Sequence, residues 1–307
     1  MGSTICLLLA AAIWGFGFVA QRFGMEHLGP YSFNAIRFFI GAISLLPLLY
    51  WYQRRGALWP KSAHLAHRDT ADAPMASLRL KHLAIAGIAV GALLFIGASL
   101  QQVGLQFTTA VKAGFITGLY LVLVPFFGLW LGHKTGLNSW IGAFIALIGL
   151  YFLSVTSGVE LNPGDLMMVI GAVFWAMHLL TIDHFVKTNH PVLLAFVQFI
   201  VCGLLSGVVA LWLETPTWPA VLLSWQPLLY AGVVSVGIGF TLQIIGQQGA
   251  HPTHAAIIMS LETVFAAIGG VWLLGEVLDQ RAIAGCGLML FGMLCSQIPI
   301  KPVVATS

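Results

Sequence analysis

The chain consists of about ten apolar stretches of membrane-crossing length, and its second half repeats its first half. Aromatic residues and prolines recur at an offset of 161 positions, where Trp14, Pro30 and Trp51 align with Trp175, Pro191 and Trp212. Glycines recur at an offset of 143 positions, where Gly132, Gly142 and Gly149 align with Gly275, Gly285 and Gly292. A unit of five crossings followed by its copy must place the copy upside down. The repeat therefore predicts an all-α integral membrane protein with ten transmembrane helices, arranged as two inverted five-helix repeats.

Composition excludes most other classes of protein. The chain has 307 residues, of which 59% are hydrophobic and 7% are charged, whereas soluble domains carry roughly 25% charged residues. Ten helices of about 20 residues use about two thirds of the length, which leaves no room for a sizeable aqueous domain. The net charge of +3 forms no basic stripe, so we expect no nucleic-acid partner. A β-barrel is disfavoured because the apolar runs do not alternate with period two.

The helices and their direction follow from proline and from positive charge. We expect helices near residues 4–22, 31–52, 82–103, 108–131, 138–156, 163–184, 191–213, 224–246, 253–274 and 280–298. Pro30, Pro163 and Pro191 mark helix starts. Most arginines and lysines between helices fall on the side of the two termini, which predicts that both termini are cytoplasmic in a multi-pass protein of the cell (inner or plasma) membrane. The first repeat covers residues 1–156, with a polar cytoplasmic loop at 53–81, and the second covers 157–307.

Two ionisable residues lie deep in predicted helices. Glu262 is nine residues into the helix 253–274, close to the membrane midplane, and His178 follows Trp175 by three positions on one helix face. Buried ionisable groups usually face a partner or a cavity. Each is either a hydrogen-bonded structural residue or a substrate-binding group that carries the coupling proton, so both are candidates for proton coupling.

Two basic residues lie closer to the outer surface. Arg37 and Lys112 are within two turns of the predicted outer ends of their helices. Their long side chains either reach out to the membrane interface or line a route that attracts a substrate carboxylate.

Aromatic and amide side chains complete the candidate substrate site. The aromatic candidates are Trp14, Phe18, Tyr120 and Trp175, and the amide candidates are Gln101 and Gln243. An aromatic stripe in a membrane helix usually faces lipid or packs against a neighbour, but an amphipathic ligand needs both residue types together. In the repeat, Arg37 aligns with Gln198, Lys112 with Ala255, Glu262 with Leu119 and His178 with Gly17. The scaffold is thus symmetric while the polar chemistry is not, and we assign selectivity to the asymmetric positions.

The sequence shows no pattern typical of metal binding, nucleotide binding or hydrolysis. The four cysteines lie in apolar spans without metal-ligand spacing, and His251 and His254 lack a third ligand nearby. No nucleotide-binding or hydrolase motif occurs. We therefore expect no metal, no cofactor, no ATP-driven pump and no enzyme, although an integral-membrane enzyme acting on lipid-linked substrates remains an alternative, as does a non-transporting sensor or scaffold.

Several short motifs resemble those of the drug/metabolite transporter superfamily, in its ten-helix EamA branch. They are Ile13-Trp14-Gly15, KAGFITGLY at residues 112–120, LETVFAA at residues 261–267, and Leu274-Gly275-Glu276. The chain departs from the family pattern at Thr263, where proline is common, and at His133, where Gly-Glu is common. The resemblance implies a central cavity lined by the first, third, fourth, sixth, eighth and ninth helices, with Glu262, Trp14 and Lys112 as shared functional residues.

These features together predict a secondary active transporter, more specifically an exporter of small amphipathic metabolites such as amino acids, related metabolites or drugs. Its partners would be the lipid bilayer, a small-molecule substrate and, if transport is coupled, protons. An uncoupled facilitator is the nearest alternative. The sequence leaves open the substrate, the direction of transport, the coupling ion and whether the protein is a monomer or a homodimer.

Overall fold

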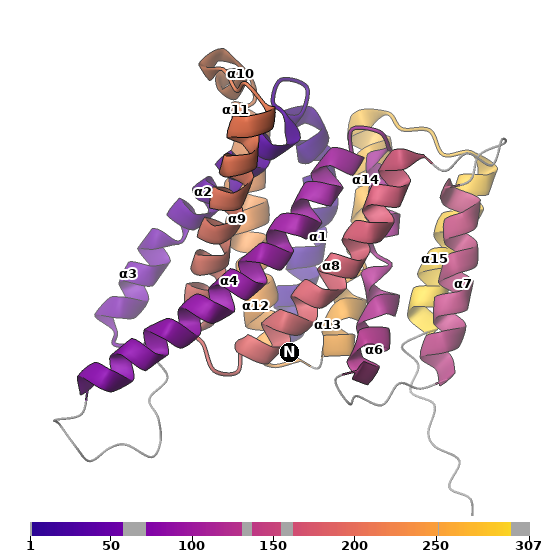
Figure 1. Cartoon of the computed structure of the whole chain (residues 1–307). Coiled ribbons are helices and arrows are strands. Elements are labelled where there is room, and N and C mark those ends of the chain that lie inside the picture. Colours follow the sequence, from indigo (N-terminus) through magenta and orange to yellow (C-terminus); the bar gives the residue numbers. More distant parts are fainter. Residues whose placement is uncertain (1, 58–71, 131–136, 155–161, 251, 296–307) are drawn as a thin grey trace, which may run out of the picture.

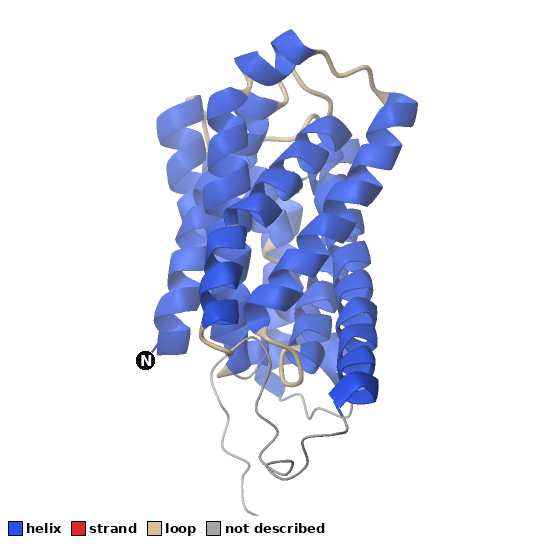
Figure 2. Cartoon of the chain, turned by 90° about the vertical axis from the view of Figure 1, so that its left-hand side faces the viewer, coloured by secondary structure: helices blue, strands red, loops and turns tan. Residues whose placement is uncertain are grey.

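Long apolar segments become helices throughout the part of the chain that the structure describes. The structure, a computed structural model, describes residues 2–57, 72–130, 137–154, 162–250 and 252–295. Its elements there are α1 (Gly2–Gly24), α2 (Pro30–Ser44), α3 (Leu46–Arg54), α4 (Asp72–Gly104), α5 (Ala110–Thr117), α6 (Tyr120–Trp130), α7 (Leu137–Ser154), α8 (Pro163–Phe185), α9 (Pro191–Leu213), α10 (Trp218–Leu223), α11 (Trp225–Leu229), the π-helix η1 (Tyr230–Phe240), α12 (Thr241–Gln248), α13 (Pro252–Met259), α14 (Glu262–Leu274) and α15 (Gln280–Cys295). They run up and down one tall bundle (Figures 1 and 2).

Seven helical segments of the described chain are long and apolar enough to cross a membrane. They are Gly2–Gly24, Pro30–Arg54, Leu78–Gly104, Ala110–Leu129, Pro163–Phe185, Pro191–Leu213 and Trp225–Gln248. Trp140–Gly149 and Glu262–Leu274 are shorter apolar helices. The predicted all-α membrane fold is therefore confirmed, while crossings by residues 138–156, 253–274 and 280–298 stay predictions.

Proline and short polar caps set several helix starts, as predicted. Pro30, Pro163 and Pro191 each occupy the first turn of α2, α8 or α9, where the missing N–H costs nothing. The Asn162 side chain accepts a hydrogen bond from the Gly164 N–H and so caps α8.

One sequence-based boundary was wrong, and one predicted helix contains a break that was not predicted. The polar loop was predicted to run from 53 to 81, but α4 already begins at Asp72; His64, His67 and Arg68 lie outside the described residues. The helix predicted at 31–52 is divided at Leu45, because Pro47 occupies the first turn of α3 and cannot donate to the preceding turn.

Helices of the two halves alternate in the bundle. α2 packs on α9, α4 packs on both α8 and α9, and α1 packs on α14, η1 and α12. α7 and α15 pair with each other at one edge of the bundle (Figure 1). α1 begins and α15 ends at the same end of the bundle (Figure 1).

The repeated glycines have a packing role at the α7–α15 contact. A Cβ on Gly149 would lie 2.7 Å from the carbonyl oxygen of Gly285, and a Cβ on Gly292 would lie 2.6 Å from the carbonyl oxygen of Gly142. Both distances are too short for a side chain, so only glycine permits this backbone approach. The repeat thus aligns glycines that meet one another across the contact.

Candidate ligand cavity

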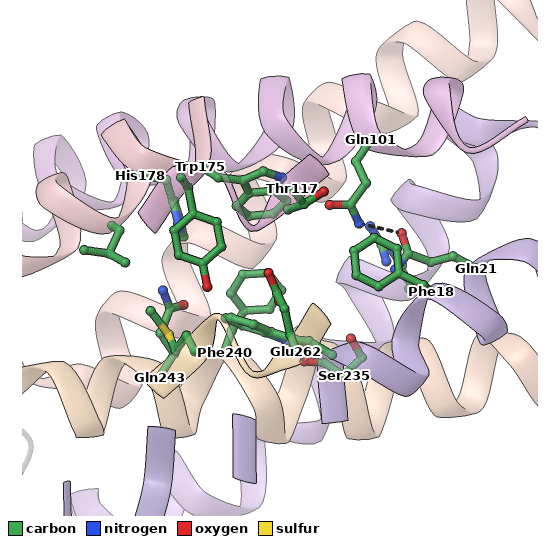
Figure 3. Close-up of a pocket in the computed structure, with 15 residues that line it drawn as sticks. Phe18, Gln21, Gln101, Thr117, Trp175, His178, Ser235, Phe240, Gln243 and Glu262 are labelled. Atoms are coloured by element: carbon green, nitrogen blue, oxygen red, sulfur yellow. Dashed lines mark hydrogen bonds between the residues drawn. The ribbon is translucent and has the colours of Figure 1, made fainter. Parts of the chain in front are cut away.

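A cavity of about 50 Å³ lies between helices of the two halves. Nine of the ten candidate site residues from the sequence line it: Trp14, Phe18, Arg37, Gln101, Tyr120, Trp175, His178, Gln243 and Glu262. Figure 3 shows Gln21 and Gln101 toward one end of the cavity, His178 and Gln243 toward the other, and the Glu262 side chain between them. Their role in binding a ligand stays a prediction.

Two helices are interrupted beside this cavity, at equivalent positions of the repeat. Gly118 and Leu119 separate α5 from α6, and Ser260 and Leu261 separate α13 from α14. Each interruption contains a tight turn closed by a backbone hydrogen bond. The Leu121 N–H donates to Gly118 O at 3.1 Å, and the Val264 N–H donates to Leu261 O at 3.0 Å. These two bonds correspond to each other at the offset of 143 positions. Interrupted helices commonly bring polar backbone and side chains to a membrane-buried site. Tyr120 and Glu262 follow the two interruptions directly, as the first residues of α6 and α14.

The interruption before Glu262 forms although this chain lacks the proline that is common at the next position in the EamA pattern it resembles. Thr263 occupies that position, and its N–H donates to Ser260 O at 3.0 Å. Gly15 of α1 lets the two helices approach there, since a Cβ on it would lie 2.7 Å from the carbonyl oxygen of Glu262.

Glu262 is buried and lacks a full set of partners. Its side chain is 4% exposed, and its Oε1 atom has no hydrogen-bond partner in the described residues. The Tyr120 hydroxyl is close enough to interact with the carboxyl, but that hydroxyl is also without a completed hydrogen bond. Glu262 forms no ion pair with any described cation. A carboxyl in this setting is available to a ligand or a proton.

Arg37 is the second buried charge of the cavity. It is 4% exposed, so the expectation that its side chain reaches the membrane interface was wrong. Its guanidinium lies over the rings of Phe38 and Phe33, 5.0 and 5.7 Å from their centroids. Among the described residues, no carboxylate lies within ion-pair distance of Arg37, and its Nε has no hydrogen-bond partner.

Aromatic rings form much of the remaining wall. The Phe240 ring lies 4.7 Å from Trp14 and stacks at 6.1 Å on Trp175. Trp14 is fixed by a hydrogen bond from its Nε1 to the carbonyl oxygen of Ser235, at 3.2 Å. The irregular π-helical turn of η1 carries both Ser235 and Phe240 to the cavity, and such turns are frequent at functional sites.

His178 is held by an amide partner. Its Nε2 lies 2.9 Å from Oε1 of Gln198 on α9, and its ring contacts those of Trp175 and Phe240. The sequence predicted either a structural or a proton-carrying histidine, and this hydrogen bond is compatible with both roles.

Hydrogen bonds join neighbouring helices at the end of the cavity where Gln21 lies. Gln101 donates from Nε2 to Oε1 of Gln21 at 2.9 Å. The neighbouring Arg22 donates from Nη1 to the carbonyl oxygens of Leu105 and Thr108. These bonds join α1 to α4 and to the start of α5.

Lys112 does not line the cavity, which corrects its grouping with Arg37 and Glu262. It stands in the first turn of α5, and its Nζ lies 3.8 Å from Oδ2 of the buried Asp165. Asp165 also accepts a hydrogen bond from the Thr108 hydroxyl. Lys112 therefore has a counter-ion at the helix ends, which explains why it is absent from the cavity wall.

Six lining residues escaped the sequence analysis: Gln21, Thr117, Leu179, Ser235, Phe240 and Met259. Gln21 follows Trp14 by seven positions and Phe18 by three, so the shared helix face could have identified it. The others are apolar or small residues in apolar helices and carry no such signal. Among the described residues, no cluster of three or more His, Cys, Asp or Glu could hold a metal ion.

Comparisons with known proteins agree with this architecture. The model of the EamA-like transporter family matches residues 2–155 and 162–297. An uncharacterized transporter of Archaeoglobus fulgidus is 32% identical over 292 residues, which cover 94% of this chain and 83% of that protein. The uncharacterized transporter YwfM of Bacillus subtilis is 27% identical and covers 95% of this chain and 92% of its own. A crystal structure with 20% sequence identity shares the fold, with a TM-score of 0.68 over 96% of both chains. The chain belongs to the EamA-like transporter family.

Proposed function

We propose that this protein is a secondary active transporter that exports small amphipathic metabolites, such as amino acids, related metabolites or drugs. The observation that carries the proposal is one cavity lined by aromatic rings and by two ionisable side chains, Arg37 and Glu262, that form no ion pair among the described residues. Burying unpaired charges in a membrane is costly, and such groups mark substrate pathways. A ligand with an apolar body and charged ends would satisfy the charges and the rings at once.

Alternating access between two inverted five-helix halves, residues 1–156 and 157–307, is the proposed mechanism. Its support is that helix contacts recur when the halves are exchanged. The contact of α1 with α14 corresponds to that of α8 with α5 and α6, and the contact of α2 with η1 corresponds to that of α9 with α4. Two similar halves can adopt two conformations that open the same cavity to opposite sides.

Both termini face the cytoplasm in this proposal, and the helices make ten crossings. The first and last described helices begin and end at the same end of the bundle (Figure 1), as an even number of crossings requires. Arg54 and Arg55 stand at the end of α3, and Lys81 lies in the first half of α4; positive residues toward one side of the membrane favour a cytoplasmic location for that side.

Proton exchange is the proposed energy source, with Glu262 and His178 as the candidate carriers. One charge moved across 100 mV supplies about 2.3 kcal/mol, which supports somewhat more than a tenfold concentration gradient at about 1.4 kcal/mol per decade. An uncoupled facilitator would use the same cavity without this contribution.

Flux into proteoliposomes tests the proposal. Purified protein is reconstituted and assayed with amino acids, nucleosides and dyes, with and without a pH gradient. We expect saturable flux of at least one amphipathic compound that a pH gradient accelerates. Glu262→Gln removes the acceleration, whereas Glu26→Gln, a change at an exposed residue, leaves it. Flux of the wild type that ignores the gradient identifies a facilitator, and the absence of saturable flux for every class refutes transport.

A further inference from the structure

The buried guanidinium of Arg37 has no counter-ion among the residues that the structure describes, and the repeat helps to explain this. At an offset of 161, Arg37 aligns with Gln198 and Gly17 aligns with His178. In the second half, the His178 imidazole and the Gln198 amide are hydrogen-bonded at 2.9 Å and both are buried. In the first half, Gly17 has no side chain to offer Arg37. The second half thus supplies a side-chain partner at this place of the repeat, and residue 17 of the first half supplies none.

Residue 17 lies beside two residues of the cavity wall. A Cβ on residue 17 would lie 3.3 Å from the Ser235 hydroxyl oxygen and 3.8 Å from Nε2 of Gln21. Ser235 and Gln21 both line the cavity, as does Arg37. The 3.3 Å approach leaves little room for a side chain at residue 17, so a partner for Arg37 has to come from the cavity itself.

We propose that Arg37, where it lines the cavity, forms a subsite for a carboxylate of the transported ligand. The carboxylate partners Arg37 from the cavity, whereas in the second half the His178 side chain partners Gln198 within the protein. This inference rests on the proposed transport function, because it assigns part of the same cavity to one end of the ligand.

The chemistry of the subsite favours a carboxylate over a neutral group. A guanidinium presents a planar fork of N–H donors that matches the two oxygens of a carboxylate. The Phe33 and Phe38 rings hold the guanidinium in place by cation–π contact but bring no negative charge. Glu262 lines the same cavity outside ion-pair distance of Arg37, so it leaves the cation free for the ligand.

Matched acids and amides test the subsite by binding to the purified full-length chain in lipid nanodiscs. The probes are 3-phenylpropanoate and cyclohexylacetate, each paired with its neutral amide, and binding is measured by calorimetry. We expect at least one acid to bind about tenfold or more tightly than its amide, the size of a charge-assisted contact. Arg37→Gln removes this preference and leaves amide affinity within about twofold.

Two further variants separate an anion subsite from a structural arginine. Arg281→Gln removes another ring-stacked arginine, one that lies over Tyr151 and Phe152 and outside the cavity, and it keeps the acid preference. Arg37→Lys keeps the positive charge but loses the planar fork of donors, so it keeps a preference for the acid that Arg37→Gln loses.

The possible outcomes distinguish failure of the proposed subsite from failure of the proposed transport function. If neither acid binds more tightly than its amide, or if Arg37→Gln retains the preference or weakens acid and amide equally, the subsite is refuted. Saturable flux without acid preference refutes the subsite and keeps the transporter. Acid-selective binding without flux of any compound keeps the subsite and refutes transport.

Discussion

Removal of one carboxylate at the end of α14 should loosen the start of α5. The Glu276 side chain accepts hydrogen bonds from the backbone N–H groups of Ala110 and Val111, at 2.6 and 2.9 Å. These are the first N–H groups of α5 and have no partner within the helix. Gly275, with φ of 65°, turns the chain so that the carboxylate can reach them.

The cost of Glu276→Ala follows from these contacts. A hydrogen bond to a charged group contributes about 1.5–3 kcal/mol when buried, and a charge at a helix N-terminus contributes about 0.3–1 kcal/mol. Because Glu276 is only part-buried, we take the lower end and expect a loss of about 2 kcal/mol. Glu276→Gln retains one acceptor oxygen and should lose about half of that.

The assay is equilibrium unfolding in mixed micelles of SDS, followed by far-ultraviolet circular dichroism. Glu214→Ala serves as a second case, because its carboxylate accepts from the N–H groups of Tyr31 and Ser32 at the start of α2. Glu26→Ala, at an exposed position, is the control and should change nothing. Wild-type stability in Glu276→Ala would refute the capping role, and wild-type stability in Glu276→Gln would show that its charge is not used.

Three further substitutions have defined outcomes in the same assay. Gly292→Val should cost about 1–3 kcal/mol by forcing α15 off α7, whereas Gly287→Val, which points into open space, should cost little; equal effects would contradict the packing argument. Gly275→Ala should cost about 1–2 kcal/mol because of its left-handed backbone, and an unchanged free energy of unfolding would show that the turn relaxes. Trp14→Phe should cost about 1 kcal/mol through loss of the hydrogen bond to Ser235, and a loss below about 0.3 kcal/mol would count against that bond.

The helices and most residues that line the cavity could be predicted from the sequence, because both follow from the free-energy cost of placing polar groups in lipid. An apolar run must form a helix in lipid to satisfy its backbone, and an ionisable residue in such a run must face a partner or a cavity. Glu262, Arg37 and His178 were identified by that cost alone. Phe240 and Met259 carry no such cost in an apolar helix, so their place on the cavity wall depends on three-dimensional packing.

The ends of side chains were the least predictable feature. Arg37 and Lys112 lie at similar distances from the predicted outer ends of their helices. In the structure, however, the Arg37 guanidinium lies against two phenylalanine rings, whereas Lys112 pairs with Asp165. The partner of Lys112 is distant in sequence, on α8, and no periodicity reveals it. Likewise, the interruption before Glu262 appears without proline, because tight turns at Ser260 and Leu261 produce it.

A second arginine at the position equivalent to Arg37 should destabilise the protein, even though the two halves share one scaffold. Glycines can be repeated because each contact needs only small size, but a second cation in one small cavity repels the first. Gln198→Arg places an arginine at the position equivalent to Arg37, so it should destabilise the wild type by more than it destabilises Arg37→Gln. In a double-mutant cycle we expect a coupling of about 1 kcal/mol or more between the two positions, measured by unfolding in micelles. Additive effects would mean that the two positions are too far apart to repel each other, and the asymmetry of the polar residues would then need a different cause.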